Sequence, residues 1–187
     1  VLTETTKIRF VAVRGDRSSA VDEAEFFKLR SDLRVLRLGT KYSNQYTGGG
    51  DQALVDLMPG GADFRSGRWQ GYEGANLDAV LDLGSKKPVH WVQANFLQDE
   101  NAWIFYPIRV SIEVSDDGKT FRPAGEVLND VPHTATGTLQ KKFAVECPEG
   151  TAARYERVVG HSLIKCPEGH KGAGSLCWIF ADEVYVE

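Results

Sequence analysis

The stretch that decides the fold is Ile108-Arg-Val-Ser-Ile-Glu-Val-Ser115, which runs directly into Asp116-Asp-Gly-Lys-Thr-Phe121. Its apolar residues alternate with polar ones, at Ile108, Val110, Ile112 and Val114. This alternation is the pattern of a strand with one buried face, and the Asp-Asp-Gly segment after it is typical of a tight turn. The sequence therefore predicts a β-hairpin here.

Further short segments with strand character surround this hairpin. We expect strands at residues 77–84, 89–97, 143–147, 153–159 and 177–186. In the first of them Leu77, Ala79, Leu81 and Leu83 share one face, Gly84 is expected to end the strand, and residues 86–88 are expected to form a turn. Many short strands and no long helical pattern predict an all-β fold, an antiparallel β-sandwich.

The N-terminal part of the chain predicts a separate small β extension. Residues 7–14 alternate like a half-buried strand, and Gly15-Asp16 forms a turn. Residues 18–29 fit either a capped helix or a return strand, and we expect the strand. Because the chain starts at Val1 and not at Met, we expect it to be a piece of a longer polypeptide. We interpret residues 1–38 as the end of a preceding small β-module and a linker, and residues 39–187 as the main domain.

Composition narrows the class of protein. A chain of 187 residues suffices for one domain with a hydrophobic core. Its net charge of −4 supplies no basic stripe, which argues against nucleic acid and anionic membranes as partners, and no apolar run is long enough to span a membrane. Three cysteines, at Cys147, Cys166 and Cys177, are too few for a disulfide scaffold or a zinc site, although one pair could bridge.

A long glycine-rich loop precedes the predicted strands. It runs from Tyr46-Thr-Gly-Gly-Gly-Asp51 through Gly60-Gly61 to Gly67-Arg-Trp-Gln-Gly-Tyr-Glu-Gly74. Glycines interspersed with carboxylates and aromatic residues suit a tightly folded loop whose carbonyls and carboxylates act as ligands. This composition favours a binding or structural loop over a catalytic centre.

Several motifs taken together resemble a known family. Trp69-Gln-Gly-Tyr72, Leu81-Asp-Leu-Gly84, Ser115-Asp-Asp-Gly-Lys-Thr-Phe121 and Asp182-Glu-Val-Tyr-Val186 look like a discoidin, or coagulation factor 5/8 type C, domain. This group includes carbohydrate-binding modules of family 32. More narrowly, Tyr46–Asp51, Gly67–Gly74 and Pro167-Glu-Gly-His-Lys-Gly-Ala-Gly174 resemble the copy at the C-terminal end of bacterial family 20 β-N-acetylhexosaminidases, or chitobiases. The resemblance covers about residues 40–187 and implies a jelly-roll sandwich with binding loops at one end.

The resemblance also implies a structural calcium ion. Carried over to this sequence, its side-chain ligands are Asp56 and Glu183, with carbonyl oxygens near Ala53, Gly67 and Ala181. Two positions depart from the pattern, because Leu57 stands where many members have glycine and Gly67 stands where others have a ligating threonine. The alternative is a loop held by hydrogen bonds from backbone amides to Asp56.

A sugar site is expected in the loop after residue 97. Sugar binding combines an aromatic face with fixed polar groups, and Gln98, Asn101 and Trp103 supply both here, with Arg65 as a further candidate. Galactose-binding relatives carry Arg and Asn near the positions of Gln98 and Ile104, so the ligand is expected to differ or the site to be silent. Four scattered histidines show no metal-ligand spacing, and only His170, in a glycine-rich turn, is a ligand candidate.

These observations predict a non-catalytic carbohydrate-binding module that acts as a monomer. Its partners would be an amino-sugar or galactose-like glycan and the catalytic domain of the same chain, in a bacterial glycoside hydrolase that works in the periplasm, at the cell surface or outside the cell. The chain lacks the length and strand-helix pattern of the barrel that carries family 20 catalysis. The alternative is a structural module that packs on the catalytic domain and binds no sugar.

Overall fold

The structure is a computed structural model that describes residues 6–26 and 32–187 and divides the chain into two units, residues 1–30 and 31–187. In the first unit, β1 (Thr6–Phe10) pairs antiparallel with β4 (Asp22–Phe26), and β2 (Val13–Arg14) pairs with β3 (Arg17–Ser18). The expected return strand is thus present up to Phe26. The part of its predicted range beyond residue 26 lies outside the described residues.

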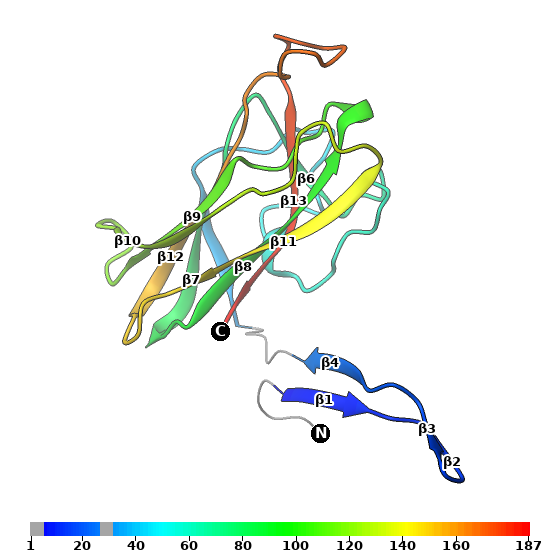
Figure 1. The fold of residues 1–187 in the computed structure, drawn as a ribbon. Helices are drawn as coiled ribbons and strands as arrows, with labels where there is room; N and C mark the ends of the chain where they lie inside the picture. Colours follow the sequence, from blue (N-terminus) through cyan, green and yellow to red (C-terminus); the bar gives the residue numbers. More distant parts are fainter. Residues whose placement is uncertain (1–5, 27–31) are drawn as a thin grey trace. The chain divides into compact units, whose positions relative to one another are not determined.

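The second unit consists of two antiparallel sheets. The five-stranded sheet has the order β10-β9-β12-β7-β5, and the four-stranded sheet has the order β11-β8-β13-β6 (Figure 1). The strands are β5 (Arg34–Leu38), β6 (Gln70–Glu73), β7 (Leu77–Pro88), β8 (Trp91–Asp99), β9 (Arg109–Ser115), β10 (Arg122–Leu128), β11 (Thr138–Glu146), β12 (Ala152–His161) and β13 (Trp178–Val186). The predicted antiparallel β-sandwich is confirmed.

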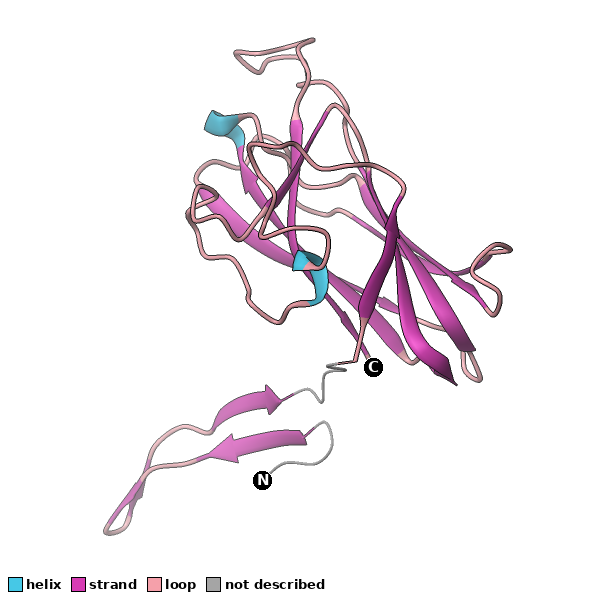
Figure 2. Cartoon of the chain, turned by 180° about the vertical axis from the view of Figure 1, so that it is seen from behind, coloured by secondary structure: helices cyan, strands magenta, loops and turns pink. Residues whose placement is uncertain are grey.

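Loops, and not helices, connect these strands. The described helical elements are two single 3₁₀ turns, η1 (Ala53–Val55) and η2 (Glu100–Ala102), which lie among the loops in Figure 2. Within the described residues, no helix has the length and apolar character that a membrane crossing requires.

The core lies between the two sheets and follows the predicted alternation. Val110, Ile112 and Val114 of β9 are buried, and the predicted face of β7 from Leu77 to Leu83 is completely buried. These residues join one hydrophobic cluster with Phe96 of β8 and with residues of β11 and β13. Ile108 is an exception: it precedes β9 and is exposed, because the strand begins only at Arg109.

Strand β7 is longer than the sequence predicts. It continues past Gly84 to Pro88, so the end expected at Gly84 and the turn expected at residues 86–88 are wrong. The register with β12 shifts between Ala153 and Tyr155, where residues 83–86 of β7 lie opposite the single residue Arg154, so this segment of β7 forms a bulge. Gly84 adopts a φ of 77°, and its N–H donates to Asp82 Oδ1 at 2.8 Å. In the sequence, a glycine within a β-bulge looks the same as a glycine that ends a strand.

Strand β5 extends the sandwich toward the N-terminus. It pairs with β7, with Val35 opposite Leu81 and Leu38 opposite Ala79. Leu33 and Val35 are buried in the main cluster. The segment that the sequence assigns to the linker therefore provides an edge strand of the five-stranded sheet.

The long loop between β5 and β6 packs tightly around Trp69. This side chain is completely buried, and its indole N–H donates to the Gly61 carbonyl at 3.1 Å. A Cβ on Gly60 would lie 2.4 Å from Cε2 and Nε1 of Trp69, whereas a Cβ on Gly61 would have no atom within 4 Å. The indole therefore requires the absence of a side chain at Gly60.

We expect Gly60→Ala to lower the free energy of unfolding by about 1–3 kcal/mol, because the added methyl group overlaps a ring that cannot move. Gly61→Ala is the matched control and should change stability by less than about 0.5 kcal/mol. Urea denaturation of both variants measures the difference. Equal midpoints for the two variants would contradict this account.

Candidate functional site

The loop after β8 is folded back on itself. Asp99 and Ile104 exchange backbone hydrogen bonds of 2.9 and 3.0 Å, and the turn η2 lies between them. Asp99 Oδ1 accepts the Ala102 N–H at 3.3 Å, and Trp103 has a left-handed φ of 64°. This geometry directs Glu100 and Asn101 outward at the tip of the loop, where Asn101 is exposed.

The glycine-rich turn at residues 167–174 is tied to this loop by His170. One ring nitrogen, Nε2, lies 2.8 Å from the Glu100 carbonyl, and Nδ1 accepts the Gly172 N–H at 3.1 Å. A carbonyl oxygen can only accept, so Nε2 carries the proton. Both segments lie at the same end of the sandwich (Figure 1). His170 therefore joins two loops and has no ring nitrogen left for a ligand.

A hollow of about 300 Å³ lies where these loops meet, and we call it the loop-end hollow. Its lining residues are Glu100, Asn101, His133, Thr134, Glu168, Gly169, His170 and Lys171. Asn101 Nδ2 donates to both carboxylate oxygens of Glu100, at 3.0 and 2.9 Å, and Lys171 Nζ lies 3.4 Å from Asn101 Oδ1. The hollow thus presents an amide, a carboxylate and an ammonium group that already contact one another.

Gln98 is not part of this surface. It is buried, and its amide Nε2 donates to the carbonyls of Pro132 and Ala135 at 3.1 and 3.3 Å. Its Oε1 accepts the Tyr106 N–H at 3.3 Å. Gln98 therefore braces three segments, and the expected role as a sugar contact does not fit its position.

Trp103 packs against buried residues at the base of these loops. It is half-buried and packs against the cluster of Phe105, Cys166 and Cys177. A Cβ on Gly172 would lie 2.8 Å from Cε2 and Cζ2 of its indole, so the glycine backbone covers part of the ring. The described residues that line the loop-end hollow do not include Trp103. The three cysteines, including the neighbouring Cys166 and Cys177, are free thiols.

Arg65 lies in a different hollow, of about 280 Å³, between residues of the long loop. This hollow is lined by Gln45, Tyr46, Thr47, Phe64, Arg65, Gly67 and Trp69. The Arg65 guanidinium carbon lies 4.0 Å from the centre of the Phe64 ring. Of the four predicted sugar contacts, only Asn101 therefore lines the loop-end hollow. The contribution of His133 was not predictable, because it reaches the hollow from a distant, irregular segment.

Some of the predicted calcium ligands lie close to one another, and one does not. Turn η1, which contains Ala53 and precedes Asp56, packs against β13, which contains Ala181 and Glu183. The Met58 N–H lies 2.8 Å from Asp56 Oδ1 and 2.7 Å from Glu183 Oε1, so the two carboxylates meet at one amide. Gly67, in contrast, lines the hollow beside Arg65.

Glu183 lies in an unusual environment for a carboxylate. It is completely buried, and its Oε2 has no hydrogen-bond partner among the described residues. Burial, together with the adjacent Asp56, raises the pKa of Glu183 to about 8. Burial also raises the pKa of the neighbouring Asp182 to about 6, although Asp182 accepts bonds from Gly60 and Asn95. Within the described residues, no group of three or more His, Cys, Asp or Glu side chains forms a metal cluster, so further calcium ligands would have to be other oxygens, such as backbone carbonyls, side-chain amides or water.

The two antiparallel sheets and the loops that connect them form a jelly-roll β-sandwich. Discoidin-like domains and family 32 carbohydrate-binding modules have this architecture. No family model matches the sequence, and no curated protein matches it. Several solved structures share the fold at low sequence identity.

One such structure is a putative chitobiase fragment from Bacteroides thetaiotaomicron, with a TM-score of 0.51 and 17% identity over 86% of this chain and 92% of the fragment. A serum fucolectin from striped bass, Morone saxatilis, has a TM-score of 0.52 and 17% identity over 79% of this chain and 44% of the lectin. A family 32 module from Clostridium perfringens, solved with galactose, has a TM-score of 0.49 and 13% identity over 83% of this chain and 93% of the module.

The backbone at Leu57 leads to a prediction about stability. Leu57 has a φ of 60° and an exposed side chain, at a position where many members of the resembled family have glycine. A left-handed conformation costs a residue with a side chain about 1–2 kcal/mol, of which glycine's extra chain entropy offsets about 0.5–1 kcal/mol. We therefore expect Leu57→Gly to raise the free energy of unfolding by about 0.5 kcal/mol. The measurement is chemical denaturation.

Met58→Gly is the control, because Met58 is exposed and its φ is not positive. It adds chain entropy without relieving strain and should lower stability. A loss of stability in both variants would show that the left-handed backbone at Leu57 carries no strain.

Proposed function

We propose that this chain is a non-catalytic sugar-binding module of a bacterial glycoside hydrolase of the β-hexosaminidase or chitobiase type. The observation that carries the proposal is the loop-end hollow, which gathers uncharged and charged polar groups at the end of a sandwich whose fold is similar to a fucolectin and to a putative chitobiase fragment. Its ligand is a single terminal sugar, of the amino-sugar or galactose-like class. The parent enzyme acts in the periplasm, at the cell surface or outside the cell, and the module holds it near glycans.

The polar groups of the hollow suit sugar hydroxyls. Asn101 and Glu100 offer donors and acceptors on one side, and Lys171 and His133 lie in the same lining. No Trp, Tyr or Phe belongs to the described lining, so recognition relies on hydrogen bonds. Such bonds contribute about 0.5–1.5 kcal/mol each, which favours millimolar affinity.

The second candidate function is a structural module that packs against the catalytic domain and binds no sugar. The observation in its favour is that Gln98, Trp103 and His170 are all engaged inside the chain. It differs from the first candidate in one measurable property, the affinity of the isolated chain for sugars.

Calorimetric titration with galactose, N-acetylgalactosamine and N-acetylglucosamine tests sugar binding. We expect a dissociation constant of about 1 mM for at least one of them and a loss of about tenfold in Asn101→Ala, since one lost hydrogen bond is worth about 1.4 kcal/mol. Arg65→Ala, in the other hollow, should leave the affinity unchanged. If no sugar binds at about 10 mM, the structural function is the better account.

We also propose that Asp56 and Glu183 hold a structural calcium ion, together with the carbonyls of Ala53 and Ala181. The fit rests on the buried, unpartnered Glu183 Oε2 and on the carboxylate of Asp56 beside it. A bound cation would neutralise both carboxylates and fasten the long loop to β13. Gly67 is left out of this set because it lines a different hollow.

Thermal denaturation after chelation, with and without added CaCl₂, tests the calcium site. Saturation at about 100 times the dissociation constant would stabilise the protein by about 2.7 kcal/mol, and Asp56→Asn should abolish the gain. Asp63→Asn is the matched control, because Asp63 also accepts a backbone N–H two residues later, from Arg65 at 2.9 Å. Identical melting temperatures with and without calcium would contradict the calcium site, and Asp56 would then only stabilise the loop through its hydrogen bond.

A further inference from the structure

A concavity larger than the loop-end hollow lies on the outer face of the five-stranded sheet. We call it the sheet-face groove; it measures about 570 Å³ and crosses β7, β12, β9 and β10. The strand register creates it, because Arg157 lies opposite Glu113 and His161 lies opposite Arg109, all on the face that points away from the core. It shares no residue with the loop-end hollow.

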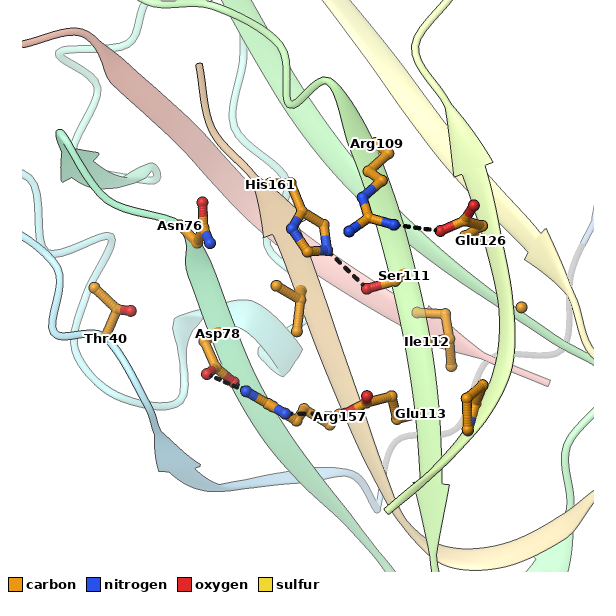
Figure 3. A pocket seen from close by; sticks show the side chains of 13 residues that line it. Thr40, Asn76, Asp78, Arg109, Ser111, Ile112, Glu113, Glu126, Arg157 and His161 are labelled. Carbon is orange, nitrogen blue, oxygen red and sulfur yellow. Dashed lines mark hydrogen bonds and ion pairs between the residues drawn. The ribbon is translucent and has the colours of Figure 1, made fainter. Parts of the chain in front are cut away.

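The charged groups of the groove already pair with one another. Arg157 donates to both oxygens of Asp78 at 2.9 and 2.8 Å and to Glu113 at 3.0 Å (Figure 3). Arg109 donates to Glu126 at 2.7 Å. A charged ligand would compete with these pairs, and separating the partly buried Arg157 from Asp78 or Glu113 would leave one group without its counter-ion. The groove therefore disfavours both anions and cations.

Several neutral polar groups remain without partners in the same space. His161 lies between Asn76 and Ser111 in Figure 3, and its Nε2 is 2.9 Å from Ser111 Oγ. Burial, followed by the charge of Arg109, lowers the pKa of His161, so the ring is neutral at pH 7. Among the described residues, its Nδ1, the Asn76 amide nitrogen and the Thr40 hydroxyl have no hydrogen-bond partner. These groups combine donors with an acceptor.

We propose that the sheet-face groove is a second binding site, for an uncharged oligosaccharide segment held through its hydroxyl groups. A volume of about 570 Å³ lies within the usual range of ligand sites. Alternating neutral donors and acceptors complement hydroxyls, which both donate and accept. The described lining contains no aromatic ring apart from His161, so the ligand binds through the hydroxyl groups at the edge of its sugar rings and not by stacking a ring face.

Backbone-amide NMR of the 187-residue chain tests this site, because it reads the groove and the loop-end hollow separately. The probes are lactose, maltotriose and chitotriose, with 3′-sialyllactose as the charged comparison. We expect at least one neutral probe to shift the amides of Asn76, Ser111 and His161 in a saturable way by about 10 mM. The charged probe should bind the groove at least fivefold more weakly than lactose.

Two variants change ligand contacts without removing structural ones, because one replaces the Asn76 amide donor by an acceptor and the other removes the Thr40 hydroxyl. Asn76→Asp keeps the Oδ1 that accepts the Ser162 N–H at 2.9 Å, and Thr40→Val keeps the side-chain shape. The double variant should weaken groove binding at least fivefold, whereas Asn101→Ala should not alter it. An unchanged spectrum outside the substituted sites confirms that the double variant is folded.

The outcomes separate this site from the proposed function. Shifts confined to Glu100, Asn101 and Lys171 would overturn the groove site and support the loop-end site. Shifts confined to the groove would support the groove site and count against the loop-end hollow. No shift of the groove amides with any neutral probe, equal binding of the charged probe, or unchanged binding in the double variant would each overturn the inference.

Discussion

The structure depends on a bulge in β13 that buries two successive carboxyl groups. Between Ala181 and Val184 the register of β13 against β8 shifts, and both Asp182 and Glu183 are fully buried. Such burial costs free energy, and hydrogen bonds to the buried groups reduce that cost. Asp182 accepts the Gly60 N–H at 2.5 Å and the Asn95 amide at 2.8 Å, and Glu183 accepts the Met58 N–H at 2.7 Å. The two carboxyl groups thus attach the long loop to a central strand.

This attachment fixes the conformation of the long loop between β5 and β6. With Gly60 held against Asp182, its α-carbon lies on the Trp69 indole, and Trp69 in turn packs with Phe64 and Phe180. The hollow beside Arg65 opens at the edge of this cluster. A segment of more than thirty residues with a single 3₁₀ turn can have a defined shape because polar contacts at its middle and an aromatic cluster at its end fix it.

Periodicity predicts the parts of this fold that depend on local sequence. The buried faces of β7 and β9 follow directly from alternating apolar residues, and the turn between β9 and β10 follows from Asp117, whose Oδ1 accepts the N–H groups of Lys119 and Thr120. Gly84 was misread because a glycine in a bulge and a glycine at a strand end have the same local signature.

The candidate site was less predictable, for a different reason. Gln98 has polar neighbours in sequence, but its partners, the carbonyls of Pro132 and Ala135, come from a loop more than thirty residues away. The sheet-face groove has no sequence signature, because its residues meet only through the register of β7, β12 and β9. Single-sequence reasoning finds which residues could bind a sugar, whereas register and loop contacts decide which of them face solvent.

The chemistry of the two proposed sites determines how such a module could work. Among the residues that the structure describes, neither lining contains a Trp, Tyr or Phe face, so each site alone would hold a sugar through a few hydrogen bonds in competition with water. Weak individual sites become effective when one ligand occupies both, or when a tethered enzyme meets many copies of the ligand, since the second contact is then intramolecular. Two polar sites of this kind would favour dense or extended glycans over free monosaccharides, and they would release products readily.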